Sequence, residues 1–223
     1  MATHKPGCRT CERLLRVASM VFAEKGYQAT TIAHICRAAQ ANVAAVNYHF
    51  GSKDGLYARV WRRAFEKSFE VYPMDGGLPA NASAEQKLAA LIRAHVHRVL
   101  DQGVLSEAGQ ILLMEMANPT EAIQEVFVEM IQPVMNHTYG IIKDLLGPEA
   151  TEIQIHFCAM SVVHQCLAFS HRRCKYATQL FMQDRVQMDD FVERLAQHIT
   201  AFSLAGIAGI RMQLSRQREG EQL

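Results

Sequence analysis

Apolar side chains recur every three or four positions along most of the chain, which is the spacing of helices that bury one face. No segment keeps the strict alternation of a half-buried strand, so we expect an all-α fold. In the N-terminal third the pattern predicts helices over about 11–25, 30–40, 42–50 and 52–71. After a Pro- and Gly-rich loop it predicts helices over 84–101, 106–117, 120–146 (interrupted or bent near Pro133), 151–171 and 188–211, followed by a fraying tail, RQREGEQL.

The second and third predicted helices lie close together in the sequence. Thr30 or Thr31 can cap the second helix and Asn42 the third, because their side-chain oxygens accept hydrogen bonds from free helical N–H groups. Only about three residues remain between the two helices, which is the connection length of a helix-turn-helix. In the third helix we expect Val43, Val46 and Phe50 to face the core.

Charge divides the chain into two parts near Tyr72. Residues 1–72 hold 11 Lys and Arg against 5 Asp and Glu, whereas the remainder holds 12 against 17, and these balances of +6 and −5 give the net +1. A basic segment on an acidic body is typical of a polyanion-binding domain, although a solvated surface could have the same balance. We therefore expect an N-terminal domain over 1–72 and a second domain over 73–223.

The stretch NVAAVNYHFGSK places polar side chains on the outer face of the third helix. In a helix-turn-helix the second helix enters the major groove, and an Asn amide can pair with adenine while small apolar residues approach thymine methyl groups. This assigns base reading to Ala44, Ala45 and Asn47. Phosphate contacts are assigned to Thr31, Tyr48, His49 and Lys53. The alternative is an ordinary packing helix with a polar outer face.

From Thr10 to Phe65 the chain resembles the DNA-binding domain of TetR-family transcriptional repressors, through VFAEKGYQATTIAHICRAA and NVAAVNYHFGSKDGLYARVW. Further along, NPTEAIQEVFVEMIQPV, HQCLAFSH and ITAFSLAGIAGI resemble the C-terminal domain of the CecR-type subgroup. The resemblance implies a homodimeric repressor that binds a pseudo-palindromic, double-stranded DNA operator and is released by a small-molecule inducer. Gln40 departs from the family, because a glycine is usual in this turn. Gln40 must therefore adopt a left-handed backbone, or the turn differs.

The C-terminal part offers candidates for dimerisation and for inducer binding. The apolar faces of 151–171 and 188–211 resemble the helix pair that forms the dimer interface in TetR-like proteins, and the alternative is that both complete a monomer core. The resemblance also implies an inducer pocket between the DNA reader and this pair, although such side chains are more often core. The candidate pocket residues are Met114, Phe127, Met130, Met135, His137 and His164.

Other chemistry is weakly indicated. Cys8 and Cys11 have metal-ligand spacing but no second pair, and the His and Cys residues between 156 and 174 do not share one helical face. No catalytic motif occurs, so we expect no enzyme, no cofactor and no metal. The absence of a long apolar run or signal sequence favours a soluble cytoplasmic protein without a membrane partner. The remaining alternative is a helical ligand-binding protein whose helix-turn-helix docks onto another protein.

Overall fold

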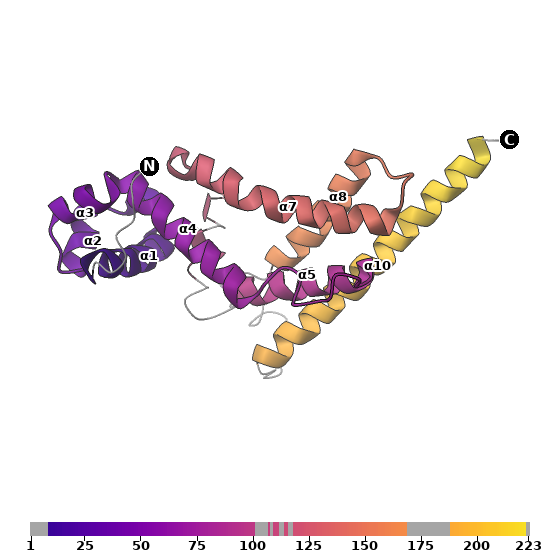
Figure 1. Ribbon diagram of the computed structural model, residues 1–223, viewed down its shortest axis with the longest axis horizontal. Helices are drawn as coiled ribbons and strands as arrows, with labels where there is room; N and C mark the ends of the chain where they lie inside the picture. The colour runs from indigo at the N-terminus through magenta and orange to yellow at the C-terminus, as the bar shows by residue number, and fades with distance from the viewer. Residues whose placement is uncertain are drawn as a thin grey trace. The chain divides into compact units, whose positions relative to one another are not determined.

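The computed structural model describes residues 9–100, 107, 109–111, 114, 115, 118–168 and 188–221. Within these ranges the regular elements are helices and no strand occurs, so the expected all-α fold is confirmed. No described helix is long and apolar enough to cross a membrane. The helices (Figure 1) are α1 (Arg9–Ala29), α2 (Ile32–Ala38), α3 (Val43–Phe50), α4 (Lys53–Val71), α5 (Ala84–Leu100), the 3-10 helix η1 (Glu121–Ile123), α7 (Gln124–Leu146), α8 (Glu152–Leu167) and α10 (Met188–Glu221).

The chain forms two compact units. The N-terminal unit comprises the residues up to Ser68 together with 103–130, and the C-terminal unit comprises 69–102 and the residues from Ile131 onward. The described residues of 103–130 therefore belong to the same unit as α1, although they lie far along the chain.

In the N-terminal unit α1, α2 and α3 pack against one another. The apolar stripe of α1 is buried, and Leu14, Ala18 and Phe22 are fully enclosed. The expectation for α3 is only partly correct, because Val46 is fully buried whereas Phe50 is half-buried and Val43 is 44% exposed. Val43 is the first residue of an eight-residue helix, so its side chain lies beyond the edge of the surface that α3 packs against.

The turn between α2 and α3 explains how the chain accommodates Gln40. Gln40 has a left-handed backbone with φ of 48°. Its N–H donates to the Arg37 carbonyl at 3.2 Å, and the Ala41 N–H donates to the Cys36 carbonyl at 2.9 Å. These two bonds form a Schellman ending to α2, a motif in which glycine usually takes the left-handed position. The Gln40 carbonyl accepts from the Arg13 guanidinium of α1 at 3.1 Å, which ties the turn to the first helix.

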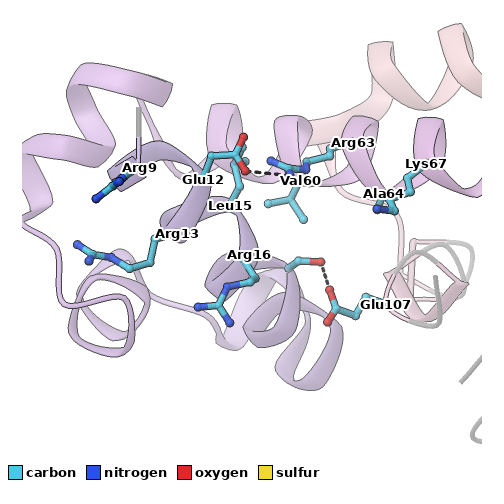
Figure 2. Close-up of a pocket in the computed structure, with 11 residues that line it drawn as sticks. Arg9, Glu12, Arg13, Leu15, Arg16, Val60, Arg63, Ala64, Lys67 and Glu107 are labelled. Carbon is cyan, nitrogen blue, oxygen red and sulfur yellow. Dashed lines mark hydrogen bonds and ion pairs between the residues drawn. The ribbon is translucent and has the colours of Figure 1, made fainter. Parts of the chain in front are cut away.

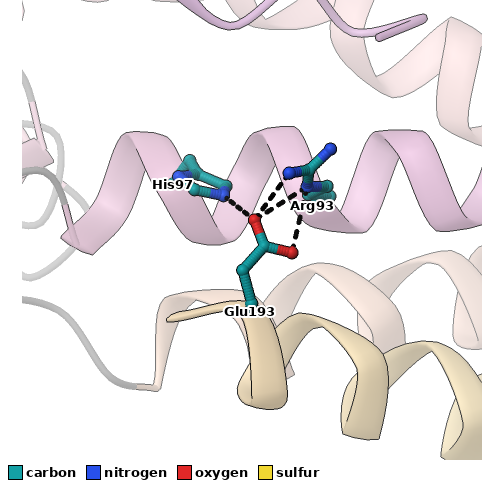
Figure 3. Close-up of polar contacts among 3 residues, drawn as sticks. All are labelled: Arg93, His97 and Glu193. Atoms are coloured by element: carbon teal, nitrogen blue, oxygen red, sulfur yellow. Dashed lines mark hydrogen bonds and ion pairs between the residues drawn. The ribbon is translucent and has the colours of Figure 1, made fainter. Parts of the chain in front are cut away.

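The C-terminal unit has its core between α5, α8 and α10, with α7 residues packed in. An ion-pair cluster joins α5 to α10 at its edge (Figure 3). The Arg93 guanidinium donates to both carboxylate oxygens of Glu193, and His97 Nε2 lies 2.9 Å from one of them. The hydrogen bonds from Arg93, together with the contact to His97 and the Arg93 charge, lower the pKa of Glu193.

Two of the later helices differ from the expectation. α7 is not interrupted at Pro133, whose position on the exposed side lets water reach the carbonyl that loses its intrahelical donor. α10 does not end near Arg211 but continues to Glu221, so the polar tail is helical in the part that is described. Ion pairing between Arg218 and Glu149 ties this extension to the turn before α8.

Candidate nucleic-acid interface

α3 presents its polar residues to solvent and is anchored through one residue. Asn47 is exposed and Tyr48 is 83% exposed, while Ala44 is exposed and Ala45 half-buried. Val46, on the opposite face, is fully enclosed. Ala44 and Asn47 thus lie on the accessible side of α3, while Ala45 lies at the edge of that side.

Local hydrogen bonds determine where α3 begins and ends. The Asn42 side chain accepts from the Ala44 N–H at 2.9 Å, as predicted for the N-cap. At the other end Gly51 has φ of 77°, a conformation suited to glycine, and its N–H donates to the Asn47 carbonyl. Asn47 and Tyr48 are therefore held on a helix with two defined ends.

Of the predicted phosphate contacts, Tyr48 and His49 lie on α3 itself, whereas Thr31 and Lys53 lie at the starts of α2 and α4. Thr31 is exposed and caps α2, because its hydroxyl accepts from the His34 N–H at 3.2 Å. His49 is half-buried, with its ring edge-on to Tyr48 at a centroid distance of 4.9 Å.

Lys53 begins α4 and has less freedom than a solvated lysine. Its ammonium lies 4.0 Å from the centroid of the Tyr27 ring, and the Tyr27 hydroxyl donates to Asp54. Partial burial lowers the pKa of Lys53, and the nearby Asp54 charge opposes this shift. The charge of Lys53 is therefore held against an aromatic ring, a role for Tyr27 that sequence reasoning did not identify.

Three of the six candidate inducer-binding residues lie in the N-terminal unit. The Phe127 ring packs 5.7 Å from Trp61 of α4 and lines a pocket of about 400 Å³. Met114 lies close to Gly26, since its Sδ would be 3.4 Å from a Cβ built on that glycine. Met130 is half-buried in the first part of α7. These three therefore belong to the same compact unit as α3.

Met135, His137 and His164 lie in the C-terminal unit. His164 is exposed, with Nδ1 2.8 Å from the Met160 carbonyl, and Met135 is half-buried. His137 differs, because its Nε2 atom is buried and has no hydrogen-bond partner among the described residues. A buried polar atom of this kind is costly unless a ligand or water satisfies it, so His137 is the strongest ligand-binding candidate of the three.

Sequence reasoning missed two polar residues of α5, His95, which lies near His137, and Arg98. His95 Nδ1 lies 2.9 Å from the Leu91 carbonyl. Its removal from water, helped by the Arg98 charge and by His137, lowers the pKa of His95 to about 4. His95 and Arg98 both lie in the apolar stripe of α5, on the same face as Leu88. Polar residues at these apolar positions are the sequence signal that could have identified them.

Arg98 is buried, and its Nε and Nη2 atoms donate hydrogen bonds to the Tyr72 carbonyl at 2.9 and 2.7 Å. Its guanidinium carbon also lies 4.0 Å from the centroid of the Phe69 ring. The cation therefore has a defined position inside the C-terminal unit.

The cysteines and histidines form no metal site in the part of the chain that the structure describes. Cys158 and Cys166 are buried free thiols, and burial raises the pKa of Cys166 to about 12. Cys8, His171 and Cys174 lie outside the described residues.

Comparison with known proteins accounts for both parts of the chain. A family model for bacterial regulatory proteins of the tetR family matches residues 14–60, the region of α1 to α4. A second model, for the C-terminal domain of the HTH-type transcriptional dual regulator CecR, matches residues 84–207, more than half of the chain. The chain belongs to the TetR family. Its C-terminal domain is of the CecR type, and the protein is a transcriptional regulator with a DNA-binding helix-turn-helix.

The three similar proteins described next are distant in sequence from this chain. The HTH-type transcriptional dual regulator CecR of Shigella flexneri is 24% identical over 169 residues, which cover 71% of this chain and 74% of the relative. The structure of FadR from Bacillus subtilis in complex with stearoyl-CoA has a TM-score of 0.63 at 14% identity, with 87% of this chain and 98% of that chain covered. The structure of AibR in complex with isovaleryl coenzyme A and operator DNA has a TM-score of 0.61 at 14% identity, with 87% and 97% covered. At these identities the two structures support the fold.

Proposed function

We propose that this TetR-family regulator is a repressor, acting as a homodimer on a pseudo-palindromic operator and released by a small-molecule inducer. The observation that carries the proposal is the exposed face of α3, where Asn47, Ala44 and Tyr48 are accessible while Val46 anchors the helix. Asn47 with Ala44 and Ala45 reads base edges in the major groove. Thr31, Tyr48, His49 and Lys53 position the DNA backbone.

Unpartnered apolar surface on α8 and α10 supports a dimer. Ile153 and Phe157 lie one turn apart on α8 and are 54% and 61% exposed, and Phe202 of α10 is 63% exposed. Further along α10, Gly206 and Gly209 have open space where a side chain would stand. A second copy can cover this surface, because small residues let another helix approach closely. The two recognition helices would then lie about one DNA turn apart, roughly 34–36 Å.

The unpartnered His137 Nε2 atom supports an inducer site in the C-terminal unit. An inducer that places an oxygen near this atom would satisfy it, and the half-buried Met135 suits an apolar ligand body. Acyl-CoA thioesters have both features, and they are the ligands held by the FadR and AibR structures. They are therefore the first class of inducer to test. The inducer acts by favouring a conformation whose reading helices no longer match the operator spacing.

Selection from a random double-stranded DNA pool, followed by anisotropy titration of the selected duplex at several salt concentrations, tests the proposal. A palindrome with a steep salt dependence is expected, because phosphate contacts release counterions. Acyl-CoA of several chain lengths is then titrated against the complex to test for release. If no sequence is enriched and binding hardly depends on salt, the helix-turn-helix is a protein-docking module and the repressor proposal is wrong.

A further inference from the structure

A groove of about 700 Å³ lies in the N-terminal unit between α1 and α4 (Figure 2). Its floor includes the buried apolar residues Leu15 and Val60. Its rim is strongly basic, because five of the 11 Lys and Arg residues within 1–72 line it. They are Arg9, Arg13 and Arg16 on α1, with Arg63 and Lys67 on α4.

Neighbouring carboxylates neutralise only part of this charge. Glu12 pairs with Arg63 at 3.1 Å. Glu107, the other carboxylate of the lining, accepts a hydrogen bond from the Ser19 hydroxyl. The groove therefore keeps an excess of positive charge.

Four of the five rim cations have no carboxylate partner among the described residues, and one of the four, Arg13, donates to the Gln40 carbonyl instead. Arg9, Arg16 and Lys67 are exposed and form no ion pair with another described residue. Their donors are consequently available to an anion.

The α4 wall of the groove lies away from Lys53, one of the predicted phosphate contacts. Lys53 begins α4, whereas Arg63 and Lys67 follow ten and fourteen residues later. With a rise of about 1.5 Å per residue, they lie roughly 15 and 21 Å further along the helix. Arg63 and Lys67 therefore cannot share a phosphate with Lys53.

The spacing of the cations suits more than one phosphate group. Arg9 and Arg16 are seven residues apart on one helix, about 10 Å along its axis, with Lys67 on the opposite wall. Guanidinium groups bind phosphate oxygens through paired N–H donors. The apolar floor suits the organic part of such a ligand.

We propose that this groove binds a small molecule carrying two or more phosphate groups, at a site separate from both the DNA-reading surface and the inducer site of the proposed function. Arg9, Arg16 and Lys67 hold the phosphates, while Leu15 and Val60 contact the organic part. The bound anion brings negative charge into the basic unit and so weakens its attraction to DNA.

The test titrates inorganic pyrophosphate and tripolyphosphate into the full-length protein without DNA, with calorimetric detection at fixed ionic strength. The groove variant combines Arg16→Gln and Lys67→Gln, both at exposed positions, so the fold is retained. The control variant combines Lys25→Gln and Arg216→Gln, which remove two exposed positive charges outside the groove.

We expect tripolyphosphate to bind the wild-type and control proteins alike, and the groove variant about tenfold or more weakly, because charge-assisted hydrogen bonds are lost. Equal affinity for the groove and control variants would overturn the proposal, because the ions would then respond only to net charge.

A second measurement uses the selected duplex to identify the source of the phosphates. If the phosphates belong to a soluble ligand and not to DNA, the groove variant and the control variant should have the same salt slope of DNA binding. A slope smaller by about two units, with no tripolyphosphate binding by the wild type, would instead assign these cations to DNA backbone contacts and overturn the proposal. The titration without DNA does not depend on repressor function, so the two proposals can fail separately.

Discussion

The Tyr57 hydroxyl donates a 2.7 Å hydrogen bond to the buried carboxylate of Glu115, fifty-eight residues further along the chain. Glu115 also accepts from the Thr120 N–H at 2.8 Å and from the Thr120 hydroxyl. Withdrawal from water and the bond to Glu115 raise the pKa of Tyr57. Through this pair, segment 103–130 is attached to α4, the helix that follows the DNA-reading helix.

Tyr57→Phe should destabilise the N-terminal unit by about 1–3 kcal/mol, because a buried carboxylate loses a donor that water cannot easily replace. Fluorescence of Trp61, the single tryptophan of the chain and 2% exposed, reports unfolding of this unit in urea. Tyr27→Phe removes a hydroxyl from the exposed pair with Asp54 and is the matched control, for which a smaller loss is expected. Equal losses would show that burial of the Tyr57 pair is unimportant.

Asn47→Ala should relax sequence preference, at a cost of about 1–3 kcal/mol for the preferred operator and little for unrelated DNA. Lys53→Ala should weaken binding to all duplexes about equally and reduce the salt slope by about one unit. Anisotropy titrations with the selected duplex and a scrambled duplex distinguish the two effects. A uniform loss in both variants would refute this division between base reading and phosphate contact.

Gln40→Gly should stabilise the N-terminal unit by roughly 0.5–1 kcal/mol, because glycine adopts the left-handed conformation at position 40 without steric cost. Gln40→Ala keeps the unfavourable backbone and should bring no gain. Urea unfolding followed through Trp61 measures both. A loss of stability in the glycine variant would mean that the Gln40 side chain itself supports the turn.

Stability of the C-terminal unit should fall as the pH decreases from about 6.5 toward 4. The pKa of His95 is lowered from 6.5 to about 4 in the folded chain, so between these values the unfolded chain binds one more proton. This difference removes up to about 1.4 kcal/mol per pH unit. Thermal unfolding by circular dichroism from pH 7 to 4.5 measures the slope. His95→Asn should flatten it, whereas His198→Asn, at an exposed site, should leave it unchanged.

Phe157→Lys combined with Phe202→Lys should convert a dimer to monomers, because charges replace apolar side chains at the centre of the proposed interface. Sedimentation velocity gives the mass directly. Met20→Lys changes an apolar side chain that is 53% exposed on α1 and should leave the mass unchanged. An unaltered dimer in the double variant would place the interface elsewhere.

Local signals in the sequence predicted much of this fold. The stripe of Leu14, Ala18 and Phe22, the Thr31 and Asn42 caps and the short turn between them determine α1 to α3. Each depends on helical periodicity or on hydrogen bonds within a few residues, so no tertiary information is needed. The family resemblance, which the matches to both parts of the chain confirm, rests on the same segments.

Contacts between distant residues could not be predicted in this way. Glu115 meets Tyr57, Glu193 meets Arg93, and His95 lies near His137 only after packing of the helices brings together residues far apart in sequence. A sequence pattern indicates which face of a helix is apolar, but it does not specify which helix covers that face. The sequence by itself therefore determined where most helices lie and which residues cap α2 and α3, while tertiary packing decided which polar groups are buried and paired and where the basic groove lies.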